Sequence, residues 1–396
     1  MTVDTAVGPG LAERRARLAV AVLFLTNGAL FANLLPRYPE IKDELGMSNA
    51  VYGLAVAAFP TGALLAGLAA GALIRRFGSA RVAVAGTLLT GLGVLVAAVS
   101  HSVALFAAAL LCAGAADALT DVAQNAQGLR VQRRYGRSII NSFHAIWSVG
   151  AVTGGLMAAG ALALDLSPAR HLTISAVVFG ALALVAGRFC LPGPDSEPEA
   201  ADRAAPRPAD GLPRVGYVLA ALVVIATAGT LVEDAGNSWA ALYLSDSLGA
   251  SAALAATGYI ALVGAQFIGR IIGDRLVDRF GQRTVARAGG LIVAAGMGLA
   301  LAVPTLPGTV LGFAAAGFGV ATLVPAAMHE ADELPGLKPG SGLTIVSWLM
   351  RLGFLLSPPV VGLVADAAGL RTGLLVVPAA GVLVVLLAGV LRERRS

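Results

Sequence analysis

Two aspartates stand inside an otherwise apolar stretch of this sequence. Asp117 and Asp121 follow the run SVALFAAALLCA, and Gln124 and Asn125 continue the polar stripe beyond them. Residues three and four apart lie on the same face of an α-helix. A charged side chain near the centre of a bilayer costs at least about 2.5–3.5 kcal/mol on insertion scales, so it is kept where it faces a partner or a water-filled cavity. The spacing therefore predicts a carboxylate site that binds a proton or a polar solute.

Three further apolar segments carry a polar stripe at helical spacing. The stripes contain Asn141 with His144, Glu233 with Asn237, and Trp348 with Arg351. Another cation, Arg270, also stands within an apolar segment. Four helices that each present one polar face predict a shared central cavity.

These stripes supply the candidate functional residues. We assign proton coupling to their titratable side chains: Asp121, Asp117, His144 and Glu233. The candidate substrate-binding residues are other polar, aromatic and charged side chains of the apolar segments: Asn27, Asn33, Asn125, Asn141, Asp234, Asn237, Gln266, Trp348 and Arg351. At 1.5 Å per residue, Asp121 and His144 lie about 13 Å and about 10 Å above the cytoplasmic edge. This similar depth favours Asp121 as the titrating acid, with Asp117 nearer the substrate.

Each assignment has a structural alternative. The two aspartates alternatively hold nearby arginines or hydroxyl groups, and the histidine is equally well explained by packing. Glu233 and Asp234 alternatively form a pair at the outer end of a helix. Stacking on a substrate and packing in the core explain Trp348 equally well. Trp239 and Tyr243 are expected to be aromatic anchors at the membrane–water interface.

The composition places these residues in a membrane protein. Of the 396 residues, 57% are hydrophobic and 13% are charged, whereas soluble domains carry about 25% charged residues. Apolar segments long enough to cross a bilayer as helices recur twelve times. They cover residues 18–36, 50–73, 82–99, 102–128, 138–163, 171–190, 215–238, 252–274, 284–303, 307–330, 341–365 and 372–391. The fold class is therefore an all-α polytopic membrane protein with twelve transmembrane helices in two six-helix, pseudo-symmetric bundles.

A stretch rich in proline, alanine and charge divides the spans into six and six. Its composition is typical of a flexible linker. We expect an N-terminal bundle at 1–190, a cytoplasmic linker at 191–214 and a C-terminal bundle at 215–396. With both termini in the cytoplasm, most of the 28 lysines and arginines fall on the cytoplasmic side, as the positive-inside rule requires. This orientation explains the basic charge balance without a nucleic-acid partner.

The two halves match each other at a constant offset of 203 residues. Aligned at this offset are LGMSNA (45–50) with LGASAA (248–253), and Phe77-Gly78 with Phe280-Gly281. Duplication of a six-span unit is a design found in transporters. Asp117 and Asp121 align with two valines, so the halves share a scaffold and not a site.

Each half carries a short motif after its second span. The two copies contain Gly71, Arg76, Gly78 and Arg81 in the first half, and Asp278, Arg279, Gly281 and Arg283 in the second. Together with the spans, the linker and the duplication, these motifs resemble the major facilitator superfamily over the whole chain. The first copy departs from the family pattern at Arg75, where the family has an acid, and the second at Asp274, where it has glycine.

Two longer stretches resemble one branch of that family. DVAQNAQGLRVQRRYGRSIINSFHAIWSVG and EDAGNSWAALYLSDSLGAS are similar to YbjJ-type inner-membrane proteins, which are distantly similar to fucose–proton symporters. This resemblance does not define a substrate.

The resemblance implies a proton-coupled secondary transporter that works by alternating access in the cell membrane. We expect a monomer whose partners are a small-molecule substrate, protons and the lipid bilayer. In the family, spans 1, 4, 7 and 10 line the cavity, flanked by 2, 5, 8 and 11, and the polar stripes fall on these helices. The eight motif residues then form a cytoplasmic gate, the alternative being that their arginines only set the topology.

Several function classes find no support in the sequence. It contains no G-x-x-x-x-G-K-[ST] phosphate loop, which makes direct use of ATP unlikely in a chain of this kind. Two cysteines and four histidines without metal-ligand spacing predict no metal site, no cofactor and no enzyme. The direction of transport stays open. GAVTGG at 150–155 keeps the glycines and not the proline of the family's antiporter motif, which favours proton-antiport efflux of a drug or metabolite. The symporter resemblance instead favours uptake of a sugar-like polar solute. A membrane receptor that does not transport is the third alternative.

Overall fold

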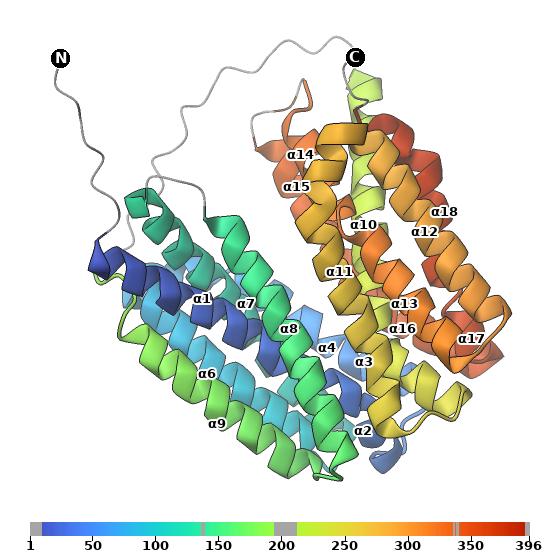
Figure 1. Cartoon of the computed structure of the whole chain (residues 1–396), viewed down its shortest axis with the longest axis horizontal. Coiled ribbons are helices and arrows are strands. Elements are labelled where there is room, and N and C mark those ends of the chain that lie inside the picture. The colour runs from blue at the N-terminus through green and yellow to red at the C-terminus, as the bar shows by residue number, and fades with distance from the viewer. Residues whose placement is uncertain (1–9, 136–138, 194–211, 336, 338–339, 393–396) are drawn as a thin grey trace. The chain divides into compact units, whose positions relative to one another are not determined.

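The computed structural model describes residues 10–135, 139–193, 212–335, 337 and 340–392. Within these ranges all regular secondary structure is helical (Figure 1). The helices divide between two compact units. Unit 1 comprises residues 1–34, 58–157 and 166–197, and unit 2 comprises residues 35–57, 158–165 and 198–396.

Unit 1 is a bundle of long helices. Its elements are α1 (Leu11–Ala32), α4 (Ala58–Gly67), α5 (Ala70–Phe77), α6 (Ser79–Ala98), α7 (Val103–Tyr135), most of α8 (Ile140–Ala163) and α9 (Pro168–Gly187). Helix α6 packs between α7 and α9, and α1 packs on both α7 and α9 (Figure 1). At the start of α8, Gln132 Oε1 accepts hydrogen bonds from the backbone N–H groups of Ile139 and Ile140, at 2.8 and 3.0 Å. These bonds satisfy donors that a helix N-terminus leaves open.

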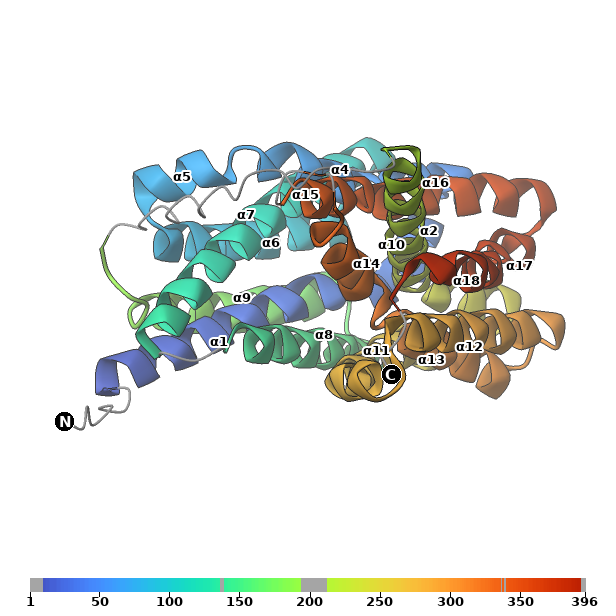
Figure 2. The ribbon, with the colours of Figure 1, turned by 90° about the horizontal axis from the view of Figure 1, so that it is seen from above.

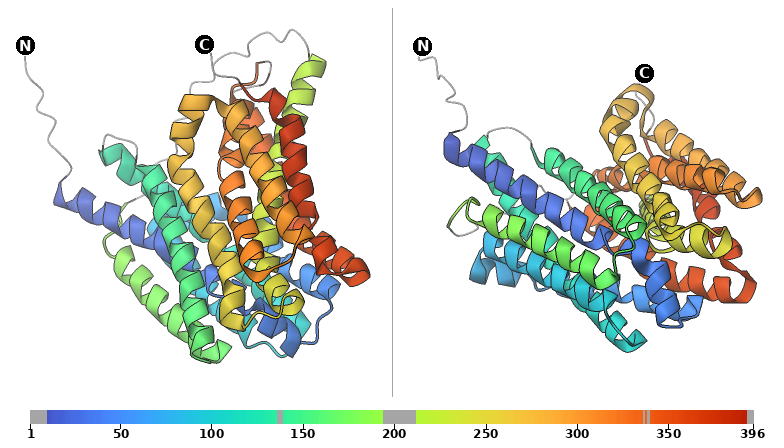
Figure 3. Two further views of the ribbon diagram at one scale, coloured as in Figure 1. Left: turned by 45° about the vertical axis from the view of Figure 1, so that its right-hand side comes forward. Right: turned by 60° about the horizontal axis from the view of Figure 1, so that its bottom comes forward.

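Unit 2 joins the second half of the chain to a short segment of the first. Its elements are η1 (Leu35–Arg37), α2 (Tyr38–Glu44), α3 (Asn49–Val56), α10 (Leu212–Leu242), the π-helical turn η2 (Tyr243–Ser247), α11 (Ala252–Phe280), α12 (Gln282–Ala302), α13 (Leu306–Val320), α14 (Leu323–Asp332), α15 (Ser341–Leu349), α16 (Arg351–Ala368), α17 (Leu370–Gly373), α18 (Val376–Leu387) and η3 (Ala388–Val390). Helix α12 packs between α13 and α18, and α13 also packs on α11 (Figures 2 and 3).

Twelve stretches of the described residues are long and apolar enough to cross a membrane, which confirms the predicted number. Several helices extend past the apolar segments that predicted them. The first continues over Leu11–Glu44, where residues 18–36 were expected, and the seventh over Val215–Ser247, where residues 215–238 were expected. Their ends carry charged side chains, which an apolar pattern does not detect.

The predicted linker lies largely outside the described residues. It was expected at 191–214, and residues 194–211 belong to the part that is not described. The division at 1–190 and 215–396 therefore stays a prediction. Residues 35–57 precede the expected boundary and yet belong to unit 2.

The 203-residue offset reappears in the helix contacts. A Cβ atom on Gly114 would lie 2.0 Å from the Phe59 carbonyl oxygen in unit 1. A Cβ atom on Gly317 would lie 2.0 Å from the Leu262 carbonyl oxygen in unit 2. Both residues of the second pair follow those of the first by 203 positions. The two halves thus repeat the same close helix crossing, at a place where only glycine fits.

Helix α3 is bound to α16 within unit 2 at the N-terminus of α3. The Asp366 carboxylate accepts hydrogen bonds from the backbone N–H groups of Asn49 and Ala50, at 2.8 and 2.9 Å. A carboxylate at this position satisfies open N–H groups and stabilises the positive end of the helix dipole. Gly53 lets the helices meet, since a Cβ atom there would lie 2.2 Å from the Pro358 carbonyl oxygen.

We predict that Gly114→Ala and Gly317→Ala each destabilise the protein by about 1–3 kcal/mol, because the added methyl forces packed helices apart. The measurement is the melting temperature of purified protein in detergent, followed by the loss of monodisperse material. Gly264→Ala is the matched control, because a Cβ atom there meets no atom within 4 Å. Equal melting temperatures for all three variants would contradict the crossing.

Candidate functional site

Hydrogen bonds join α1, α7 and α8 around one asparagine. Asn27 donates from Nδ2 to Asp117 Oδ1 at 2.7 Å. Its Oδ1 accepts from Trp147 Nε1 at 2.9 Å and from Gln124 Nε2 at 3.3 Å. Asn27 and Gln124 are buried, while Asp117 and Trp147 are half-buried. We call these four residues the Asn27 network. They form a polar cluster in unit 1, and the side chains of Asp117 and Trp147 are partly exposed.

Small residues allow α1 and α8 to approach. A Cβ atom on Gly28 would lie 2.2 Å from the Trp147 carbonyl oxygen, and one on Gly150 would lie 2.2 Å from the Leu25 carbonyl oxygen. Because α1 and α8 meet at two glycines, the indole of Trp147 reaches Asn27. The glycines of the sequence therefore position the hydrogen bonds of the network.

The predicted stripe on α7 forms a hydrogen-bonded row. Asp121 is exposed, and its Oδ1 accepts from Asn125 Nδ2 at 3.1 Å and from Gln124 Nε2 at 3.4 Å. His144 is also exposed, and its ring meets the Phe24 ring edge-on with centroids 5.2 Å apart. That Asp121 lies within reach of His144, as their similar depths suggest, stays a prediction.

A second polar cluster lies between α10 and α11 in unit 2. Gln266 Nε2 donates to Glu233 Oε2 at 2.8 Å. Arg270 Nη2 lies 3.7 Å from the same oxygen and forms an ion pair. The structure thus brings together two predicted residues, Glu233 and Gln266, and adds a cation.

Asp234 and the aromatic residues after it lie in the interior of unit 2. Asp234 is 7% exposed and accepts a hydrogen bond from the Ser238 hydroxyl at 3.4 Å. Trp239 and Tyr243 are 0% and 1% exposed, so the expectation that they anchor the membrane interface was wrong. The ring of Trp239 packs edge-on against Tyr52, with centroids 4.9 Å apart.

Asn33, a predicted substrate ligand, ties α1 to α9. It is fully buried, and its Nδ2 donates to the Ala29 carbonyl oxygen at 2.8 Å. Its Oδ1 lies 2.8 Å from Nε2 of the buried His171. These contacts engage both ends of the amide within unit 1.

Three predicted substrate ligands have open side chains. Asn141 and Arg351 are exposed, and Trp348 is 59% exposed. None of the three side chains makes a hydrogen bond or ion pair with another described residue. Arg351 begins α16 directly after a break, where the Thr230 hydroxyl donates to the Met350 carbonyl oxygen at 2.7 Å. Asn237 is half-buried on α10.

The two motif copies adopt the same turn. Gly78 has φ 85° between α5 and α6, and Gly281 has φ 81° between α11 and α12. These left-handed values favour glycine. The Arg76 guanidinium lies over the Phe77 ring at 5.2 Å from its centroid, and that of Arg279 lies over the Phe280 ring at 5.3 Å.

The outer members of the motifs differ between the copies. Arg283 Nε donates to the Leu391 carbonyl oxygen at 2.9 Å, next to the end of η3. A cation is favourable at such a helix C-terminus. Gly71, Arg81 and Asp278 are exposed.

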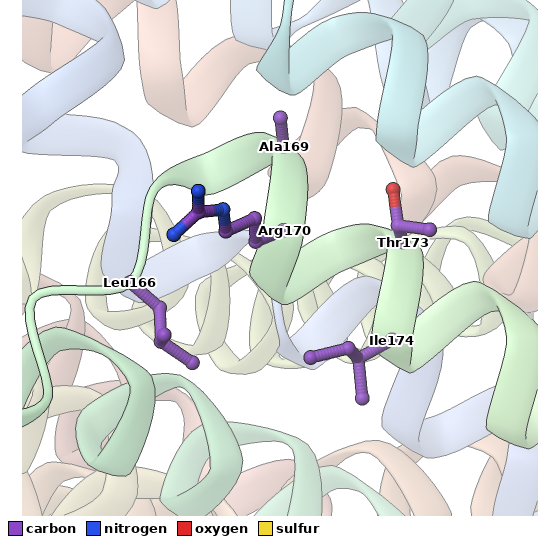
Figure 4. Close-up of a pocket in the computed structure, with 5 residues that line it drawn as sticks. All are labelled: Leu166, Ala169, Arg170, Thr173 and Ile174. Carbon is purple, nitrogen blue, oxygen red and sulfur yellow. The ribbon is translucent and has the colours of Figure 1, made fainter.

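A surface pocket lies at the start of α9 in unit 1. Figure 4 shows its lining by Leu166, Ala169, Arg170, Thr173 and Ile174, at the start of α9 and the loop before it. It contains no predicted functional residue. Within the described ranges, no group of three or more histidine, cysteine, aspartate or glutamate side chains could hold a metal ion.

Two members of the clusters were absent from the predicted site. Trp147 follows His144 by three residues, and Arg270 follows Gln266 by four. Trp147 therefore lies on the face of the stripe of Asn141 and His144, and Arg270, noted from the sequence only as a cation in an apolar segment, lies on the helix face of Gln266. This spacing could have placed both in the site.

The sequence matches one protein family. The model of the Major Facilitator Superfamily matches residues 20–264 and 221–396. An uncharacterized transporter, y4wD of Sinorhizobium fredii, is 32% identical over 378 residues, which cover 94% of this chain and 97% of that relative. Membrane protein MosC of Rhizobium meliloti is 29% identical, over 92% of this chain and 88% of MosC.

Solved structures of transporters share the fold. A mutant of the nucleoside transporter NupG superposes with a TM-score of 0.75 and 13% sequence identity, over 94% of this chain and 98% of that one. A D-xylose–proton symporter superposes with a TM-score of 0.69 and 17% identity, over 95% and 96%. At these identities the likeness supports the fold alone.

We predict that Asn27→Ala destabilises the protein by about 1–3 kcal/mol, because it leaves polar partners on α7 and α8 unsatisfied. The melting temperature in detergent should fall by a few degrees. Asn141→Ala removes an exposed amide that makes no such contact with the described residues, and it should leave the melting temperature unchanged. If both variants melt together with the wild type, the Asn27 network does not stabilise unit 1.

Proposed function

Because the chain belongs to the Major Facilitator Superfamily, we propose that it moves a small polar solute across the cell membrane in exchange or in common with protons. Family membership makes it a secondary transporter and not an enzyme. The observation that carries the proposal is the Asn27 network, in which a half-buried carboxylate is held by an amide that an indole also binds.

The chemistry around the network suits a polar solute. Trp147 and Asp117 are half-buried, and Asp121, Asn141 and His144 are exposed on the same helices, α7 and α8. Carboxylates, amides and imidazole bind hydroxyl and amine groups, and an indole face packs on the C–H surface of a sugar-like ring. These side chains favour binding of a hydrophilic solute over binding of an apolar drug.

Two acids one helical turn apart support proton coupling. Asp117 and Asp121 repel each other when both are ionised, so one proton bound between them lowers the electrostatic energy. Asp117 has a fixed donor in Asn27, whereas Asp121 is exposed and open to proton exchange. We therefore assign the exchanging proton to Asp121, with His144 as its relay, and substrate contact to Asp117.

The membrane topology and the cytoplasmic gate are also part of the proposal. The twelve spans and the composition of residues 191–214 support two six-helix bundles at 1–190 and 215–396. The charge distribution supports a cytoplasmic location for the joining segment and for both termini. The motif turns at Gly78 and Gly281 are proposed as a cytoplasmic gate. The resemblance to YbjJ-type proteins supports that branch as the chain's own, and we propose a monomer.

The substrate class is tested by uptake into membrane vesicles of both orientations. The probes are radiolabelled pentoses, hexoses, cyclic polyols, nucleosides and a hydrophobic cationic dye. We expect saturable transport of a hydroxyl-rich probe and counterflow by its unlabelled form. Transport of the dye alone would favour efflux of an apolar compound, and binding without counterflow would favour a receptor.

We predict that Asp121→Asn in proteoliposomes keeps solute exchange and loses accumulation driven by a pH gradient, because the amide cannot carry a proton. Asp43→Asn is the control, since Asp43 is an exposed acid on α2 and should leave accumulation intact. Unchanged accumulation in Asp121→Asn would remove Asp121 from the coupling role.

A further inference from the structure

Asp234, a buried acid in unit 2, has an environment unlike that of the neighbouring acid, Glu233. Asp234 Oδ1 accepts a hydrogen bond from Ser238 at 3.4 Å, and Oδ2 has no hydrogen-bond partner among the described residues. Asp234 makes no ion pair with any described residue. Glu233, one position earlier, has both Gln266 and Arg270. The two adjacent carboxyl groups therefore differ in whether a cation balances them.

Aromatic residues of α2 and α3 cover the region around Asp234. The Tyr52 hydroxyl donates to the Ser238 carbonyl oxygen at 2.6 Å. The Tyr52 ring meets those of Tyr38 and Trp239 edge-on, with centroids 5.6 and 4.9 Å apart. All three rings are fully buried. The segment 38–56 thus packs on α10 about one helical turn after Asp234, within unit 2.

The titratable groups around Asp234 are acids and phenols. Glu233 lies on its own helix, Tyr38 on α2 and Tyr52 on α3. Asp246 of η2 lies close enough to Tyr52 for its charge to affect the phenol. The hydroxyl of Ser357 on α16 also lies close to the Asp234 carboxyl.

Cations on the elements packed against α10 are bound elsewhere or lie further off. They pair as Arg37 with Glu40, Lys42 with Asp246, and Arg270 with Glu233. Arg351 of α16 lies six residues from Ser357, or about 9 Å of helix. No described cation therefore balances a charge on Asp234.

Asn237 Oδ1, on the same helix, is a second buried acceptor without a donor among the described residues.

An ionised carboxylate without a cation is very costly in such surroundings, and buried carboxyl groups of this kind neutralise instead. Hard metal cations are bound by six or more oxygen ligands, whereas aromatic rings form much of this wall. A proton on Oδ2 removes the charge and turns an unpaired acceptor into a donor.

We infer that Asp234 is a proton-binding site, and that segment 38–56 encloses the bound proton when it packs on α10 in unit 2. Tyr38 and Tyr52 of this segment form what we call the aromatic cover of Asp234. Exchange of the proton requires this cover to move away from α10. The hydrogen bonds from α3 to Asp366 and the Lys42–Asp246 ion pair hold that cover in place. A role of the proton in driving transport rests on the proposed function, while its presence on Asp234 does not.

The test is infrared spectroscopy of the purified full chain in lipid nanodiscs at neutral pH. We predict a protonated-carboxyl C=O band in the wild type that Asp234→Asn removes. Glu233→Gln, the matched control one residue away, should leave this band in place. Ser238→Ala should shift its frequency, and Tyr52→Phe should speed its shift in deuterated buffer, because the cover is then less firmly bound.

Three outcomes would overturn the inference. The first is an unchanged carboxyl band in Asp234→Asn, and the second is loss of the band in Glu233→Gln alone. The third is a change in carboxylate bands on replacing choline by sodium that is seen in the wild type and absent in Asp234→Asn, which would make the site a sodium site. No transport is measured here, so a failed inference and a failed proton-coupling proposal are distinguishable.

Discussion

A carboxyl group in a membrane-spanning helix must have its charge balanced or removed, and this constraint organises the polar interior of both units. Asp117 has an amide donor from Asn27, and Glu233 has an amide and a guanidinium. Asp234 has a hydrogen bond from the Ser238 hydroxyl, the Ser357 hydroxyl close by, and no ion pair with a described cation. The three acids solve the same electrostatic problem in different ways. Asp117 is held by a neutral amide donor, Glu233 is paired with a cation, and Asp234 is assigned a proton.

The partners of these acids depend on close helix crossings. Gly28 and Gly150 bring α1 against α8, so that Trp147 reaches Asn27. Gly53 brings α3 against α16, near the aromatic cover of Asp234. Without a hydrophobic driving force between helices in lipid, such small-residue contacts and interhelical hydrogen bonds hold a bundle together. The same glycines therefore determine both packing and chemistry.

The sequence was sufficient for the twelve spans and for the repeat, because both follow from helix length and from a constant offset. The polar faces of α7 and α10 were also predicted from spacing. Periodicity gives a face but not the helix that it meets, so the pairing of Asn27 with Trp147 was not foreseen. Trp239 and Tyr243 have the composition of interface anchors, and only tertiary packing by α2 and α3 buries them. The docking of Asp366 on α3 joins positions too far apart in sequence for any local pattern.

The central claim is that movement of the solute is coupled to movement of protons bound by carboxyl groups, in the same or the opposite direction. The most direct measurement is proton flux, recorded with a pH dye in proteoliposomes when a gradient of the transported solute is imposed at equal pH. The account predicts proton movement in the wild type and its loss in the double variant Asp117→Asn/Asp121→Asn. Solute movement in the wild type without any proton flux would contradict it.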